Sequence, residues 1–230
     1  MIQPKRITRY DRNHPELELF LVFSVLVANK ESERIADIVN KMFSISHDSK
    51  FNDLVKQESP LTYDVGGGLR IHSPMSFIHC LIEHYCLHQW LKYWGTGQYN
   101  RISNCLKECT EKFLDPFGKG TNLKVVTVEE LERIHGIGPK TARFFVVHSQ
   151  RNAQHAVLDT HIMKYMGSKY GHYFKTRLGA ITPSNPCIYK LIETLFLGEA
   201  AKQGMSPAEL DLFIWKYYKG KEVVQNELSV

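Results

Sequence analysis

Lys140 stands two residues after the second glycine of a Gly136-Ile137-Gly138 turn, and Pro139 predicts that a helix begins beside it. A positive charge is disfavoured at a helix N-terminus, so this position favours the neutral amine. A neutral amine is a nucleophile that can form a Schiff base with an aldehyde-level carbon. The alternative is that Lys140 only contacts a phosphate group, and without further context this alternative is the more common role of such a lysine.

Asp159 supplies a second reactive group, because it follows Lys140 by nineteen positions. One helix and one loop fit in that interval, so the chain can return Asp159 to the neighbourhood of the lysine. A carboxylate there could stabilise a developing cation and assist proton transfer. Asp159 is also a good N-cap for a helix that begins at Thr160, and the two roles are compatible.

The elements around Lys140 predict a helical hairpin. Thr127 and Glu130 have the spacing of a capping box, which predicts a helix over 127–135. The glycine turn ends it, and a second helix runs to about Gln150. The turn glycines and the free N–H groups of the second helix form an anion site that suits one phosphate, without reading sequence. Ile134 and Ile137 would pack the turn onto the core.

The whole chain is predicted to be all-α, because alternating strand patterns are nearly absent. Helices are expected at about 15–28, 31–43, 75–93, 98–113, 127–135, 139–150, from 160, 186–203 and 207–219. Residues 44–70 are polar and glycine-bearing, which is typical of a loop. The glycines at 66–68 lack the spacing of a phosphate-binding loop, so we interpret them as a turn.

Composition restricts the class of protein. The 230 residues are 43% hydrophobic and 23% charged, as in globular proteins, and the net charge of +5 permits a nucleic-acid partner. The longest mainly apolar run is ten residues, Leu19 to Ala28, which is too short to span a membrane. Five cysteines without a CxxC pair argue against a disulfide framework, and no secretory signal is visible. We therefore expect an intracellular protein.

Two segments resemble a known family. LERIHGIGPKTA at 131–142 and AVLDTHI at 156–162 resemble the helix-hairpin-helix DNA glycosylases of the endonuclease III and 8-oxoguanine glycosylase superfamily. The matching residues are Gly136, Gly138, Lys140, Ala142, Asp159 and His161. The resemblance implies two helical lobes with a DNA-binding cleft between them. We expect residues 31–158 in the hairpin lobe, with 1–30 and 159–230 in the other.

The resemblance also implies a reaction. Relatives with a lysine at the position of Lys140 flip a nucleotide out of the duplex, attack C1′, displace the base and nick the strand by β-elimination. Asp159 would orient or deprotonate the lysine and stabilise the oxocarbenium-like state. The expected activity is that of a bifunctional DNA N-glycosylase and abasic-site lyase in base-excision repair. Its partner would be double-stranded DNA with a damaged or modified base.

Further roles come from the same resemblance. Residues expected to contact DNA are Asn29, His135, Gly136, Ile137, Gly138, Thr141 and His161. Aromatic candidates for stacking on the base are Trp94, Phe144, Trp215 and Tyr217, although core packing is the more common fate of such residues. Many relatives hold a monovalent cation on hairpin carbonyls, which would be those of Ile134, Gly136 and Ile137 here. The basic stretch 160–192, which has no acidic residue, would line the cleft.

The chain departs from one branch of the family. Endonuclease III ends in four cysteines that bind an iron–sulfur cluster, and residues 207–230 contain none. No cofactor is therefore expected. This favours the branches without a cluster, whose best-known substrate is 8-oxoguanine, with oxidised pyrimidines or a modified phage base as alternatives. We expect a monomer in the cytoplasm or nucleoid, or in the nucleus of a eukaryote, with no membrane partner.

Two other interpretations compete with an enzyme of this family. Cys80, His84 and His88 recur on one face of the helix expected at 75–93, and zinc accepts such ligands. No CxxC or HExxH element supports a metal site, so no side-chain ligand to a metal is expected. A non-catalytic hairpin module that only grips DNA is the second interpretation, but such a module needs neither Lys140 nor Asp159.

Overall fold

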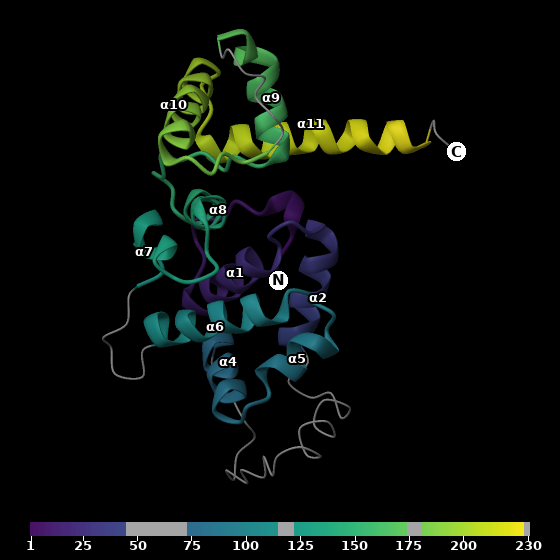
Figure 1. Ribbon diagram of the computed structural model, residues 1–230, viewed down its shortest axis with the longest axis vertical. Coiled ribbons are helices and arrows are strands. Elements are labelled where there is room, and N and C mark those ends of the chain that lie inside the picture. Colours follow the sequence, from purple (N-terminus) through teal and green to yellow (C-terminus); the bar gives the residue numbers. More distant parts are fainter. Residues whose placement is uncertain (45–72, 115–121, 174–180, 228–230) are drawn as a thin grey trace. The chain divides into compact units, whose positions relative to one another are not determined.

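The computed structural model describes residues 1–44, 73–114, 122–173 and 181–227 (Figure 1). These residues form α-helices and two short 3-10 helices, η1 (Pro4–Arg6) and η2 (Gly171–Tyr173), and contain no strand. The all-α prediction is therefore confirmed for the described chain. Two compact units are present: Met1–Pro4 with Asp11–Ile137, and Lys5–Tyr10 with Gly138–Val230.

The first unit is built around its first helix. Its helices are α1 (His14–Leu26), α2 (Ser32–Ser44), α4 (Pro74–Glu83), α5 (Leu87–Tyr93), α6 (Tyr99–Phe113) and α7 (Val128–Glu132). Asn13 and Glu16 form a capping box at the start of α1, which packs on α2, α4 and α6. Residues Leu21 to Leu26 are all buried, so α1 is the core helix of this unit.

A buried carboxylate fixes the contact between α1 and α4. Glu18 is 2% exposed, and its Oε2 accepts a hydrogen bond from the Met75 N–H at 3.0 Å. Its Oε1 lies 3.2 Å from His14 Nε2. A buried carboxylate is stable only with such partners, so the polar side chain links the start of α4 to the middle of α1.

The single helix predicted at 75–93 is wrong, because the chain forms α4 and α5 with a break between them. Tyr85 has a positive φ of 58°, and the Cys86 N–H donates back to the Leu81 carbonyl at 2.8 Å. This is a left-handed helix ending of the Schellman type, here without a glycine. The continuous face expected to carry Cys80, His84 and His88 does not form. In the described residues, no three His, Cys, Asp or Glu side chains gather into a group that could hold a metal.

In the described residues of the second unit, four α-helices surround a separate core. They are α8 (Pro139–Ser149), α9 (Thr160–Tyr170), α10 (Pro186–Lys202) and α11 (Pro207–Glu227). The helix α11 packs against each of the other three. Large side chains fully or nearly fully buried in this core include Ile162, Met166, Ile192, Phe196, Leu210 and Ile214.

The two units differ from the predicted division of the chain into 31–158 and 1–30 with 159–230. The helix α1 belongs to the first unit, because its apolar residues are buried against α2, α4 and α6. The helix α8 belongs to the second unit, because it packs on α11. The division therefore falls inside the hairpin turn, between Ile137 and Gly138.

Some predicted features lie outside the described residues, among them the glycine turn at 66–68 and part of the basic stretch, 174–180. Within the described part of the chain, no helix combines the length and the apolar character needed to cross a membrane.

The helix break yields a stability prediction. Tyr85 is 90% exposed, so replacing it with glycine removes the cost of positive φ without losing packing. We expect Tyr85→Gly to raise the free energy of unfolding by about 0.5–1 kcal/mol, measured by urea denaturation. Tyr85→Ala is the control, because alanine keeps the strained backbone. Equal stabilities of the two variants would contradict this explanation.

Candidate active site

Lys140 lies in the first turn of α8, directly after the helix-initiating Pro139, and is partly buried. Gly138 is the N-cap residue and offers no side-chain hydrogen bond to the helix. The first hydrogen bond of α8 runs from the Ala142 N–H to the Gly138 carbonyl at 3.0 Å. The N–H groups before Ala142 therefore have no helical acceptor, which is the arrangement that attracts an anion.

Asp159 is the N-cap residue of α9 and is partly buried. Its Oδ1 accepts a hydrogen bond from the Ile162 N–H at 2.8 Å. Within the described residues its Oδ2 has no hydrogen-bond partner, so one carboxylate oxygen caps the helix while the other stays available for chemistry. The N-cap role and a reactive role are structurally compatible.

The electrostatic surroundings of Asp159 include Lys140. Burial raises the pKa of the Asp159 carboxyl above its ordinary value, and the negative charge of Asp211 raises it further. The Ile162 N–H, Lys140 and His161 act in the opposite direction without reversing the rise. Lys140 and Asp159, far apart in sequence, thus lie in one electrostatic neighbourhood of the second unit.

Glu193 of α10 connects the elements that carry Lys140 and Asp159. Its Oε1 accepts hydrogen bonds from Arg143 Nε at 2.9 Å and from the Ala156 N–H at 3.0 Å, and His155 Nδ1 lies 3.5 Å away. Burial raises the pKa of Glu193, but the nearby His155 and the hydrogen bonds from Ala156 and Arg143 outweigh it and hold the pKa at about 2. The carboxylate therefore stays ionised and ties α8 to the segment before Asp159.

Tyr189, also on α10, fixes the same segment. Its hydroxyl donates to the Ala156 carbonyl at 2.8 Å and accepts from the Leu158 N–H at 3.3 Å. The guanidinium of Arg143 lies over the Tyr189 ring, 4.4 Å from its centre. One buried tyrosine hydroxyl therefore binds both a carbonyl and an N–H group of the backbone segment that precedes Asp159.

The hairpin turn is held by α6, and sequence reasoning missed this role of Arg101. Arg101 Nη1 donates to the Gly136 carbonyl at 2.9 Å and Nη2 donates to the Val25 carbonyl at 3.3 Å. Gly136 has a φ of +90°, and a Cβ there would lie 3.2 Å from Cys105 Cβ. The His135 N–H donates to Glu108 Oε2 at 2.7 Å. Arginine at this point of the sequence carries no signal that it would bind backbone so distant along the chain.

Asn29 and its neighbour lie at the end of α1. Asn29 is exposed with a φ of +60°, a conformation that asparagine tolerates. Lys30 Nζ donates to the Leu26 carbonyl at 3.0 Å. Burial, with the charges of Arg101 and Arg34, lowers the pKa of Lys30 to about 8. Asn29 therefore lies beside a crowded group of cations.

Comparison with known proteins identifies the fold. No family model and no curated protein matches the chain. Among solved structures, the 8-oxoguanine DNA glycosylase of Thermotoga maritima matches with a TM-score of 0.59. The match covers 94% of this chain and 87% of that one.

The chain has a DNA glycosylase fold. The sequences are 20% identical, so the likeness establishes the fold. The resemblance to helix-hairpin-helix glycosylases, predicted from two short segments, is therefore confirmed at the level of the fold.

The remaining DNA-contact candidates of this glycosylase fold belong to different units. His135 and Ile137 lie in the first unit, His135 exposed and Ile137 buried. Thr141 and His161 lie in the second unit and are partly buried. The His161 ring stacks on Tyr218 of α11, with ring centres 6.0 Å apart.

The candidates for base stacking are likewise divided. Trp94 belongs to the first unit, and its partly buried ring contacts Tyr93 edge to face. Phe144 belongs to the second unit, packs on its core and contacts the His148 ring edge to face. On α11, Lys219 lies over the Trp215 ring, whereas Tyr217 is 50% exposed. Phe144 is thus engaged in packing, and Tyr217 offers the more accessible ring.

Two of the hairpin carbonyls expected to bind a monovalent cation already accept hydrogen bonds. The Gly136 carbonyl accepts from the guanidinium of Arg101, and the Ile134 carbonyl accepts from the Ile137 N–H at 3.1 Å. An oxygen that already faces a full positive charge is a poor ligand for another cation. The residues present therefore do not fit a cation at Gly136.

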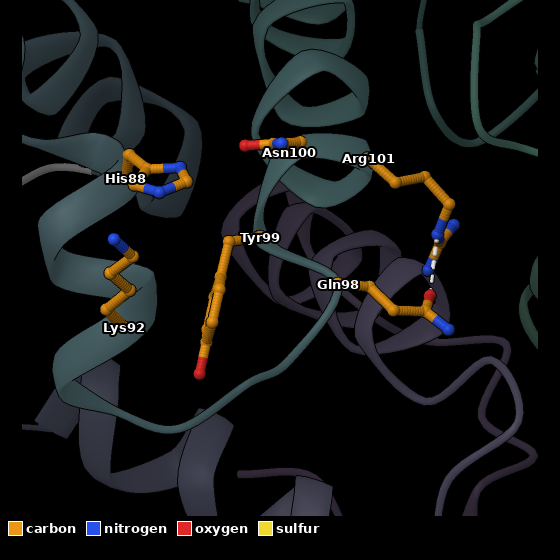
Figure 2. Close-up of a pocket in the computed structure, with 6 residues that line it drawn as sticks. All are labelled: His88, Lys92, Gln98, Tyr99, Asn100 and Arg101. Atoms are coloured by element: carbon orange, nitrogen blue, oxygen red, sulfur yellow. Dashed lines mark hydrogen bonds between the residues drawn. The ribbon is translucent and has the colours of Figure 1, made fainter.

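A polar hollow of about 430 Å³ lies in the first unit, where α5 approaches the start of α6. Figure 2 shows its lining, in which His88 and Lys92 face Tyr99, and Arg101 reaches Gln98. The sixth lining residue is Asn100, and the lining includes no acidic side chain. Lys92 and Arg101 bring two basic side chains, a chemistry that suits an anion.

The hairpin turn yields a matched pair of variants. Gly136→Ala should lower the free energy of unfolding by about 1–3 kcal/mol, because alanine adds backbone strain and crowds Cys105. Gly138→Ala should change it by less than about 1 kcal/mol, because nothing lies within 4 Å of a Cβ there and the φ is −93°. Thermal or urea unfolding of both variants would measure the difference. A Gly138 variant as unstable as the Gly136 variant would refute this assignment.

Proposed function

We propose that this protein is a DNA glycosylase with abasic-site lyase activity, acting in base-excision repair on a nucleotide flipped out of the duplex. The observation that carries the proposal is the placement of Lys140 and Asp159 in one electrostatic neighbourhood of a glycosylase fold. Flipping exposes the C1′ carbon of the sugar, which is inaccessible inside the stack.

In the first step, the neutral Lys140 amine attacks C1′ of the flipped nucleotide. The new N–C1′ bond forms as the glycosidic bond breaks, and the base leaves with the bonding electrons and takes up a proton. Asp159 accepts the proton that the attacking nitrogen releases once the N–C1′ bond has formed, and it stabilises positive charge on the sugar. Its raised pKa supports this role, because it makes the carboxylate a better proton acceptor than an ordinary aspartate.

In the second step, opening of the sugar ring converts the adduct into an imine between Lys140 and C1′. Loss of a proton from C2′ then breaks the C3′–O bond, which nicks the strand on the 3′ side of the lesion. Water hydrolyses the imine and releases Lys140. The lysine thus serves both base removal and strand cleavage.

The DNA partner is double-stranded and is held mainly through its backbone. The free N–H groups at the start of α8 suit a phosphate, and Gly138 leaves the approach open. Asn29 and the exposed His135 provide further polar contacts in the first unit. The cationic lining at Lys92 and Arg101 adds attraction for phosphate groups.

The substrate that we favour is 8-oxoguanine, the base for which the matched glycosylase of Thermotoga maritima is named. Oxidised pyrimidines or a modified phage base are the alternatives, because pocket side chains and not the hairpin decide the base. We propose that the protein acts as a monomer inside the cell, without a cofactor. The absence of cysteine from residues 207–230 supports the lack of an iron–sulfur cluster.

The lyase chemistry is tested by trapping the imine. Incubation with duplexes carrying 8-oxoguanine, an oxidised pyrimidine or an abasic site, in the presence of borohydride, should yield a covalent protein–DNA adduct visible by denaturing electrophoresis. Lys140→Gln should abolish the adduct, because an amide is not a nucleophile for this step. Lys202→Gln, an exposed lysine in the last turn of α10, is the control and should trap normally. Absence of an adduct on every duplex would leave the non-catalytic DNA-binding module as the better interpretation.

The role of Asp159 is tested by Asp159→Asn. Asparagine can still cap α9, so folding and DNA affinity should be retained. Base removal under single-turnover conditions should slow by about 10²–10⁴-fold, because the proton acceptor is lost. An unchanged rate would remove Asp159 from the mechanism.

A further inference from the structure

A buried polar chain lies behind the candidate active site in the second unit. His148 of α8 is 0% exposed, and its Nε2 lies 2.9 Å from Asp211 Oδ2 on α11. Its Nδ1 lies 2.8 Å from the hydroxyl of Thr8. The proposed mechanism uses none of these three residues, although buried polar groups are costly unless they are satisfied.

One neutral tautomer of His148 satisfies the whole chain. When Nε2–H donates to the Asp211 carboxylate, Nδ1 is left as the acceptor for the Thr8 hydroxyl. The backbone repeats this connection, because the Arg9 N–H donates to the His148 carbonyl at 3.1 Å. The Asp211 side chain is 12% exposed, and it is held in position by the fully buried imidazole of His148.

Asp211 is also connected to the candidate active site through the packing of α9 on α11. The charged or titratable groups that face Asp159 are Asp211 from α11, Lys140 from α8 and His161 from α9. Lys140, His161 and the capping N–H of Ile162 each favour the ionised carboxylate and would make it a weak base. Burial is the largest influence that raises the pKa of the Asp159 carboxyl, and Asp211 is the neighbouring negative charge that raises it further against these groups.

We propose that Asp211, held in place by the imidazole of His148, is a positioning residue that keeps the Asp159 carboxylate an effective proton acceptor for Lys140. This inference rests on the proposed function. Helix packing alone would not require a carboxylate at this point, because an apolar pair could join α8 to α11 without the cost of burying a charge. The presence of a carboxylate at position 211 is explained if the negative charge of Asp211 acts on Asp159.

The test measures the single-turnover rate of strand cleavage against pH on a duplex with one abasic site, a substrate that needs no identified base. Removing the negative charge of Asp211 lowers the pKa of Asp159, so the carboxylate forms at lower pH. Asp211→Asn should therefore shift the acidic limb of the profile down by about one pH unit and lower the plateau rate. Asparagine still accepts a hydrogen bond from His148, so the packing is preserved.

A double variant shows whether the effect passes through Asp159. In an Asp159→Asn background, Asp211→Asn should no longer shift the acidic limb, because the group that responds is absent. A shift that persists in this background would mean that Asp211 acts directly on Lys140 and would overturn the proposal. Glu209→Gln, an exposed change on the same helix, is the control and should leave the limb in place.

The remaining outcomes are also decisive. A lower plateau with an unmoved limb in Asp211→Asn would show that the His148–Asp211 pair is structural only. Should that variant fail to fold by circular dichroism, Asp211→Ser removes the same charge with a smaller side chain and is held to the same shift. If the wild-type protein cleaves the duplex and the Asp211 variant leaves the acidic limb unmoved, this inference alone is overturned. No cleavage by the wild-type protein overturns the proposed function together with it.

Discussion

The ionised carboxylate of Glu193 is the interaction on which the arrangement of the reactive groups depends. It is buried in the second unit, and it binds Arg143 one turn along the helix from Lys140. It also binds the backbone three residues before Asp159. Removing one partner from such a buried pair typically costs about 3–5 kcal/mol, because the remaining charge is left uncompensated. The positions of Lys140 and Asp159 therefore depend on the charge of Glu193, which takes no part in the proposed reaction.

Much of the fold could be predicted from local signals. The capping box at Thr127, the proline at the start of α8 and the aspartate before α9 all lie within four residues of the helix ends that they define. Predictions of helix ends succeed because the information lies close together along the chain. The expectation that Lys140 and Asp159 act together came from their types and spacing and from the likeness to one family, and it stays a prediction.

Interactions between distant residues could not be predicted in the same way. Tyr85 ends α4 in a left-handed conformation for which glycine is the usual signal, so the break was invisible. Arg101 binds the hairpin turn across 35 positions, and Glu193 binds Ala156 across 37. Arginine and glutamate are usually exposed, so their residue types do not indicate that these two side chains bind distant backbone in the folded protein. The identity of the excised base stays beyond these patterns for the same reason, since pocket shape arises from side chains brought together by folding.

The connection between Thr8 and His148 has a consequence for how the chain reaches its native state. The chain begins in the first unit, enters the second at Lys5–Tyr10, returns to the first and completes the second from Gly138 onward. The hydrogen bond from Thr8 spans 140 positions, so during synthesis this segment waits until α8 and α11 exist. Closing so long a loop is slow and entropically costly. The second unit is therefore expected to be the late-folding part of the molecule, and the groups proposed for catalysis would assemble last.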